Sequence, residues 1–434
     1  MRTRTHLSRI VHVGAAAALL ATTLGAGISH AAPTKAPVTL TFWSWVPHLQ
    51  DEVNLFEKAR PDIKVNLVNV GQGAPFYTKL RTALKAGSGA PDVTQIEFQY
   101  MPTFELTGKL VDLSQYGANA YKKDFVPWTW DQVSQGSKVY SIPQDSGPMA
   151  LLYRADIFAK YHLAVPATWA QYQQEAITLH KDNPKIYMTE FAANDGGWIN
   201  SLLWQAGAWP FKVNGTSLSI DFTSAKALQV VNYWGSMVKA GVLSTVPDFT
   251  TSWYTGLANG TIASWPTAGW GPVFLAGQAA KTTGKWRAAP LPQWTAGAHA
   301  SGNWGGSTDA VTTQSQHPKE AAEFAIWLND NFKSASQLAS EQFLFPTTKA
   351  VLNSPSFDSP QAFYGGQKVN GIFATASSHV DLGFQWSPFQ DYVYSQMGVV
   401  LGNAVNGKTS FSGALSTLQS TLVGYAKNQG FTVQ

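Results

Sequence analysis

The 434-residue sequence contains no cysteine, which excludes disulfides, iron–sulfur clusters, thiolate zinc sites and cysteine nucleophiles. It also excludes a lipobox, because the acylated residue of that motif must be cysteine. Charged residues are scarce at 13%, about half the ~25% usual in soluble proteins, whereas hydrophobic residues make up 44%. This balance argues against a disordered chain and a salt-bridged coiled coil, and it predicts a globular protein of two or three domains.

An excess of charge of one sign is lacking as well. The net charge of +4 falls to +1 when Arg2, Arg4 and Arg9 are set aside, leaving 27 basic and 26 acidic residues. A nucleic-acid-binding protein would carry a basic surface, so we expect no nucleic-acid partner. The six histidines beyond residue 32 never lie within five residues of one another, and we expect neither a metal nor a cofactor.

The amino-terminal segment 1–32 has the order of a secretory signal peptide. Three arginines precede an apolar stretch over 13–28, and Ser29-His30-Ala31 resembles a cleavage site. The alternative is a membrane anchor, but about 16 apolar residues fall short of the roughly 20 that span a bilayer. We therefore expect a protein secreted to the periplasm or to the extracellular face of the membrane, without a lipid anchor.

Strands and helices alternate from residue 38 onward. The segments 38–43, 63–70 and 93–97 have strand patterns, and helical spacing over 48–59 and 75–86 predicts helices between them. This βαβαβ order predicts an α/β fold with a parallel sheet, because its crossovers are right-handed. Ligands of open α/β sheets bind beyond the carboxyl ends of the strands.

The loops at those three strand ends carry candidate ligand-binding residues. They hold Trp43 and Trp45, then Gln72, then Glu97. Flat indole faces beside an amide and a carboxylate form the mixture of apolar surface and few polar groups that a sugar requires. The alternative for either tryptophan is that it merely packs under its loop.

Six segments carry a family pattern in this order: LTFWSW, FEKARPDIKVNLV, YTKLRTALKAGSGAPDVTQIE, GKLVDLS, YSIPQDSGPMALLYRADIF and NGTIASWPTAGWGP. In them the chain resembles the family 1 solute-binding proteins of carbohydrate ABC transporters, of the maltose-binding type. The resemblance implies a type II periplasmic-binding-protein fold, with two lobes joined by hinge strands and each lobe a mainly parallel sheet flanked by helices. The lobes would comprise 38–147 with 306–358, and 148–305 with 359–434.

The same resemblance implies a function. A di- or oligosaccharide would be held in the cleft between the lobes and delivered to the permease of an ABC transporter. We expect no enzymatic activity and a monomeric protein. The many tryptophans, 17 in all, favour an oligosaccharide, since each sugar ring needs its own platform.

Further site residues follow from matching positions. Asp145 lies at the first crossing between lobes, where the family has an acidic sugar ligand, although a turn-capping aspartate is the alternative. Trp270, with Trp265 second, matches an aromatic at a strand–turn–helix element that stacks on the ligand. Trp386 matches a further stacking aromatic.

Glycine-rich segments supply the remaining candidates. Asp195 and Trp198 flank paired glycines, and Trp304 with Gly305 begins the predicted crossing back to the first lobe. Other tryptophans are expected in the core, by their apolar neighbours or their helical position: Trp204, Trp209 and Trp327.

Residues 402–409, GNAVNGKT, match the letters of a Walker A motif. A P-loop needs a preceding buried strand and a downstream acidic residue, yet the preceding residues look helical and no Asp or Glu follows Asp391. We expect instead a helix end, a turn at Asn406-Gly407 and a new helix capped by Thr409 or Ser410.

A secreted glycoside hydrolase is the main functional alternative, because aromatic platforms line hydrolase subsites and two carboxylates suffice for that chemistry. Its carboxylates would come from a small set: Glu97, Asp145, Asp195 and Asp381. The family pattern runs through the lobe-crossing segments and favours a binding protein. A cell-surface carbohydrate module would leave those segments without a purpose.

Overall fold

The computed structural model describes residues 36–434, so the predicted leader 1–32 lies outside the described residues. A five-stranded sheet of order β2-β1-β3-β12-β6 organises the first part of the chain. Its first three strands are parallel, as predicted, and its last two involve antiparallel pairs. The strands are β1 (Val38–Trp43), β2 (Ile63–Val68), β3 (Val93–Glu97), β6 (Ser141–Pro143) and β12 (Ser307–Val311).

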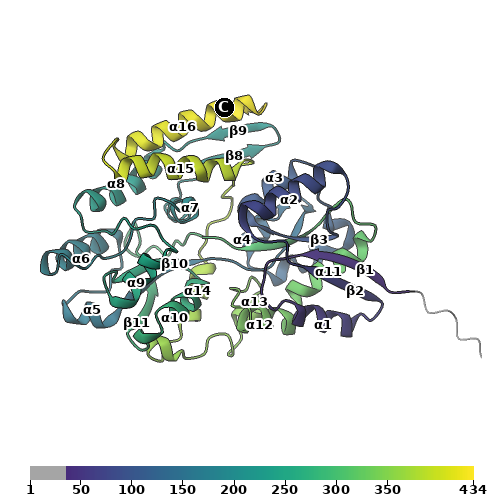
Figure 1. Cartoon of the computed structure of the whole chain (residues 1–434), viewed down its shortest axis with the longest axis horizontal. Helices are drawn as coiled ribbons and strands as arrows, with labels where there is room; N and C mark the ends of the chain where they lie inside the picture. The colour runs from purple at the N-terminus through teal and green to yellow at the C-terminus, as the bar shows by residue number, and fades with distance from the viewer. Residues whose placement is uncertain (1–35) are drawn as a thin grey trace, which may run out of the picture. The chain divides into compact units, whose positions relative to one another are not determined.

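Helices cover both faces of this sheet. Successive side chains of a strand point to opposite faces, and apolar residues on both faces are buried against helices. Val93 of β3 belongs to one apolar cluster, together with residues of α1 (Gln50–Ala59), α11 (Pro318–Asp330) and α12 (Phe332–Ser340). Ile96 of the same strand belongs to another, with residues of α2 (Gly73–Ala86) and α3 (Met101–Glu105). Figure 1 shows α2 and α3 on one side of the sheet and α1 and α12 on the other.

A second, three-stranded sheet has the order β10-β7-β11. These strands are β7 (Met149–Arg154), β10 (Ser264–Ala268) and β11 (Trp286–Pro290), and β7 is antiparallel to both neighbours. The parallel arrangement expected in each lobe therefore does not hold here. The reason is that β7 enters from the first sheet and inserts between two strands that run in one direction, as β12 does between β3 and β6.

The second sheet packs in a tryptophan-rich core. Trp234 lies at its centre, with ring centroids 5.4 Å from Trp169 and 5.0 Å from Trp198. The surrounding helices are α5 (Ala155–Lys160), α6 (Trp169–Asp182), α7 (Gly196–Gln205), α8 (Ala225–Lys239), α9 (Thr251–Asn259), α10 (Gly271–Gln278), α14 (Val369–Ser377), α15 (Gln390–Val405) and α16 (Phe411–Asn428).

The remaining elements are short. Besides several 3₁₀ helices, they are α4 (Pro127–Asp131), α13 (Lys349–Leu352), β4 (Ser134–Gln135), β5 (Lys138–Val139), β8 (Phe211–Asn214), β9 (Ser217–Ile220) and β13 (Thr432–Val433). Within residues 36–434, no helix combines the length and the apolar character that crossing a bilayer requires.

The segment with Walker A letters is a junction between two helices. Helix α15 ends at Val405, Gly407 follows with φ 72°, and α16 begins after Ser410. The Ser410 hydroxyl accepts a hydrogen bond from the Gly413 amide at 3.0 Å. The expected helix end, turn and capped helix are confirmed, with Ser410 as the cap.

This cap gives a direct test. Ser410→Ala removes the acceptor of an otherwise unpaired helix-end amide and should destabilise the protein by about 1 kcal/mol in urea unfolding followed by circular dichroism. The matched control is Lys408→Ala, which alters the exposed lysine of the apparent motif and should leave unfolding unchanged. Destabilisation by the lysine variant alone would contradict the helix-junction account.

Candidate functional site

Trp43 and Trp45 follow β1 but lie in different environments. Trp43 is 7% exposed and packs against Phe76 of α2, with ring centroids 6.4 Å apart. Lys79 Nζ of the same helix lies 4.9 Å from the Trp43 ring. Trp43 thus packs beneath α2, which was the alternative considered for it. Trp45 is only partly buried, 4.9 Å from Phe76, and keeps exposed surface at the strand end.

Glu97, at the end of β3, is held by Tyr77 of α2. The Tyr77 hydroxyl donates to Glu97 Oε2 at 2.9 Å and accepts from the Glu97 amide at 3.0 Å. Burial raises the pKa of Glu97 to about 7, although the Tyr77 hydrogen bond opposes the shift. Gln72 lies exposed at the start of α2. The two predicted polar residues therefore flank the same helix.

Asp145 joins two of the segments that pass between the sheets. Its Oδ1 accepts from the Ser307 amide at 2.7 Å and also from the Ser307 hydroxyl. Burial raises the pKa of Asp145 to about 6, against those hydrogen bonds. The carboxylate therefore does not cap its own turn. It links β12 to the residues that follow β6 through these hydrogen bonds.

A buried amide connects this junction to the first strand end. Gln95 accepts from the Ser44 hydroxyl at 2.8 Å and from the Trp45 amide at 3.2 Å. Its own amide group donates to Gln144 at 3.0 Å and to Ser307 at 2.8 Å. Sequence reasoning missed Gln95, although its position inside the predicted strand 93–97, two residues before the strand-end residue Glu97, was a usable signal. The network fixes the Trp45 loop relative to the crossing segments.

The crossing segments lie so close to each other and to α7 that only glycine fits at two positions. A Cβ atom at Gly147 would lie 1.8 Å from the Trp304 carbonyl oxygen, and one at Gly302 would lie 1.9 Å from the Ser201 carbonyl oxygen. Trp304 donates its amide to the Gly147 carbonyl at 2.8 Å. Gly305, with φ 79°, then turns the chain toward β12.

On the second sheet, Trp270 keeps exposed surface and leans on the crossing. Its Nε1 donates to the Trp304 carbonyl at 2.9 Å, and the two rings lie 4.8 Å apart. Trp265 is fully buried behind them, 6.1 Å from Trp270. The strand–turn–helix element predicted around Trp270 is confirmed. Its strand is β10, its helix is α10, and Trp270 lies in the turn between them. Trp265 therefore packs beneath the rings of Trp270 and Trp304.

Other predicted tryptophans occupy core positions. Trp198 is 1% exposed and donates its Nε1 to the Pro266 carbonyl. Trp386 is 4% exposed and packs 5.9 Å from the buried Trp204. Strand β10 covers Trp198, and the stacked rings of Phe384 and Trp204 cover Trp386. Neither indole therefore presents a face to an open surface. Trp209, expected in the core, is instead 36% exposed, and Trp327 is partly buried.

Asp195 caps α7 by accepting the Trp198 amide at 2.8 Å. Its neighbour Asp248 accepts from Asn194 at 2.6 Å. Burial, and next the charge of Asp195, raises the pKa of Asp248 to about 8. Sequence reasoning missed Asp248, because it lies in an irregular loop with no periodic pattern.

Helix α15 brings the two groups of residues together. Asp391 Oδ2 pairs with Arg81 Nη2 of α2 at 2.9 Å. Burial raises the pKa of Tyr394, and the charges of Asp195, Glu97 and Asp391 raise it further. Tyr394 packs against the apolar cluster of the first sheet, and a Cβ atom at Gly196 would lie 2.5 Å from its Cδ1 atom, so it also lies against the start of α7. Sequence reasoning missed both residues of α15.

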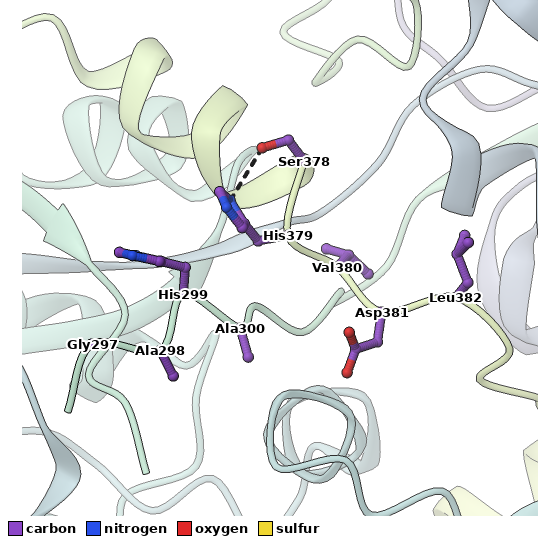
Figure 2. A pocket seen from close by; sticks show the side chains of 9 residues that line it. All are labelled: Gly297, Ala298, His299, Ala300, Ser378, His379, Val380, Asp381 and Leu382. Atoms are coloured by element: carbon purple, nitrogen blue, oxygen red, sulfur yellow. Dashed lines mark hydrogen bonds between the residues drawn. The ribbon is translucent and has the colours of Figure 1, made fainter. Parts of the chain in front are cut away.

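A separate hollow is lined by residues 297–300 and 378–382 (Figure 2). The ring centroids of His299 and His379 lie 5.5 Å apart at its edge. Asp381 is the one carboxylate among the lining residues, and none of the predicted ligand-binding residues contributes. This hollow lacks the pair of carboxylates that glycoside hydrolysis requires.

Glu97 generates a prediction about pH. Its carboxyl ionises near pH 4.5 ordinarily and near 7 in the folded protein, so the folded state holds the extra proton between those values. The contribution of Glu97 to the stability of the folded protein is complete below pH 4.5 and is lost as the pH rises through about 7. Glu97→Gln, which can still accept from Tyr77, should lose less thermal stability than wild type between pH 4.5 and about 8.

The control for that comparison is Glu57→Gln. Burial raises the pKa of Glu57, but hydrogen bonds from Lys64 and Val65 outweigh burial and hold this pKa below its ordinary value. Glu57 therefore stabilises the folded protein at neutral pH, and this stabilisation is lost on acidification. Parallel melting curves of wild type and Glu97→Gln over the whole range would contradict the assignment.

Comparison with known proteins agrees with this architecture. The family model described as bacterial extracellular solute-binding protein matches residues 43–331. A lactose-binding protein of Rhizobium radiobacter is 26% identical over 363 residues, 77% of this chain and 81% of that one.

Two solved structures match nearly the whole chain. An ABC transporter associated binding protein of B. animalis subsp. lactis, in complex with β-1,6-galactobiose, is 32% identical with a TM-score of 0.78, covering 92% of this chain and 100% of that one. The galacto-N-biose-/lacto-N-biose I-binding protein of Bifidobacterium longum, with lacto-N-biose, is 26% identical with a TM-score of 0.81 and the same coverage. The fold is thus the two-lobed type II periplasmic-binding-protein fold, and the chain belongs to the bacterial extracellular solute-binding proteins.

Proposed function

We propose that this protein is the sugar-binding receptor of an ABC transporter. It captures a neutral di- or oligosaccharide between its lobes and delivers it to the permease. The observation that carries the proposal is that α15 contacts both groups of residues: Asp391 pairs with Arg81 of α2 at 2.9 Å, and Tyr394 packs against Gly196 at the start of α7. The proposed sugar site lies here, with aromatic and carboxyl groups contributed by both lobes.

The residues proposed to contact sugar are those with exposed surface at this place. Trp45, Gln72 and Glu97 belong to the first lobe, and Asp195 and Trp270 to the second. Trp304 and Gly305 form the floor between them. The buried positions of the other candidates assign them to support: Trp43, Asp145, Trp198, Trp265 and Trp386.

Galactose-containing disaccharides are the first ligands to examine, because relatives are named for or solved with lactose, lacto-N-biose and β-1,6-galactobiose. We also propose that segment 1–32 directs export, that the mature protein is a monomer outside the cytoplasm, and that no lipidated cysteine holds it, since the sequence has none. The proposed lobe boundaries are those inferred from the sequence.

Calorimetry tests the ligand class. Titration with galacto-, gluco-, xylo-, manno-, fructo- and arabino-oligosaccharides should reveal one sugar bound at micromolar affinity or tighter, roughly −8 kcal/mol. Chromatography after overnight incubation should return that sugar intact, because the matching family is one of solute-binding proteins and supplies no acid and nucleophile pair. Binding of a peptide or a polyol phosphate, with no heat from any neutral sugar, would overturn the proposal; shorter sugar products would favour a hydrolase.

Trp270 supplies a residue-level test. Trp270→Ala should weaken binding of the sugar at least tenfold, the loss of about 2 kcal/mol expected for an aromatic anchor. Because Trp270 also packs on Trp304 and Phe274, the variant should melt somewhat earlier as well. Trp209→Ala, which removes a 36% exposed indole elsewhere, is the matched control and should bind normally. An early-melting Trp270 variant with unchanged affinity would assign this indole to the core.

A further inference from the structure

Phe249 lies at the exposed end of the second lobe's aromatic cluster. Its ring centroid is 6.1 Å from Trp270, 5.9 Å from Trp304 and 6.4 Å from Trp265. Those rings support it from behind, while 41% of its own surface is exposed. The result is a broad apolar face that continues the surface of Trp270, built from a residue that sequence analysis did not single out.

The backbone at Phe249 is in an unfavourable conformation, with φ 56°. This left-handed region is disfavoured for bulky residues, and such strain persists only where neighbouring contacts enforce it. The contacts on both sides are visible: Asp248 is held by Asn194 at 2.6 Å, and Thr250 caps α9 by accepting the Trp253 amide at 3.3 Å. Position 249 is fixed between two anchored neighbours.

The preceding residue connects Phe249 to the proposed site. Asp248 is 4% exposed, and its Oδ1 accepts from Asn194 at 2.6 Å. Its carboxyl also forms a hydrogen bond with the carboxyl of Asp195. Phe249 therefore follows directly after a residue that is tied to Asp195, which is already proposed to contact the sugar.

We propose that Phe249 is a sugar-stacking residue that extends the Trp270 platform and selects ligands with a second ring to cover. This inference rests on the proposed function. A neutral pyranose presents an apolar face of C–H groups, which suits an exposed aromatic ring, and the strained backbone holds that ring in place before the ligand arrives. A structural role is the competing explanation, because Phe249 precedes the α9 cap and lies 6.5 Å from Tyr254, as in a hydrophobic staple.

Two substitutions separate stacking from packing. Phe249→Leu keeps apolar contact with Tyr254 but lacks a flat face, and Phe249→Tyr keeps the flat face. With the tightest sugar of the screen, starting from β-1,6-galactobiose, the leucine variant should bind at least tenfold more weakly and the tyrosine variant within about threefold of wild type. Equal binding by the leucine variant would overturn the inference.

The strain has its own matched control. Phe343 has φ 60° and is 51% exposed, so it resembles Phe249 in residue type, conformation and exposure, yet it makes no ring contact among the described residues. Asparagine tolerates this conformation better. Phe249→Asn should melt no lower than wild type while losing sugar affinity, and Phe343→Asn should bind normally. A lower melting temperature with full affinity in Phe249→Asn would establish the staple instead, whereas a wild-type protein that binds no sugar would overturn the proposed function itself.

Discussion

Two of the segments that connect the lobes, around Gly147 and around Trp304, lie side by side with no room for a methyl group between them. At Gly147 an added Cβ would overlap the Trp304 carbonyl, and at Gly306 it would lie 2.8 Å from the Asp145 carbonyl oxygen. Contact this close lets backbone groups pair across the junction, and the Asp145–Ser307 hydrogen bonds secure it further. The proposed site depends on this junction, because Trp304 belongs to it and Trp270 bonds to Trp304.

From this junction the structure extends in two directions. Toward the first lobe, Gln95 links Ser307 to the Ser44–Trp45 loop, so the strand-end residues are placed by buried hydrogen bonds. Toward the second lobe, the aromatic cluster rests on Trp304. The Arg81–Asp391 pair joins α2 to α15 between them. Since that pair is partly exposed, its contribution to stability should be modest and sensitive to salt.

The sequence predicted the elements better than it predicted the surroundings of individual side chains. The strands 38–43 and 93–97 have patterns that depend only on neighbouring residues, and both were found. Whether an indole is exposed depends on tertiary contacts, so Trp198 and Trp386 resembled site residues in the sequence but are core residues. Phe249 was missed because its exposure and its φ of 56° arise from the way two anchored neighbours constrain the loop.

We propose that sugar binds between the Trp45–Glu97 strand ends and the Trp270–Phe249 surface, above Trp304. A crystal structure of the protein with its sugar tests this most directly. We expect one ring of the sugar to stack on Trp270 or Phe249 and a hydroxyl to lie within hydrogen-bond distance of Glu97 or Asp195. A sugar found instead in the hollow beside His299 and His379 (Figure 2), with the Trp270–Phe249 platform uncovered, would contradict it.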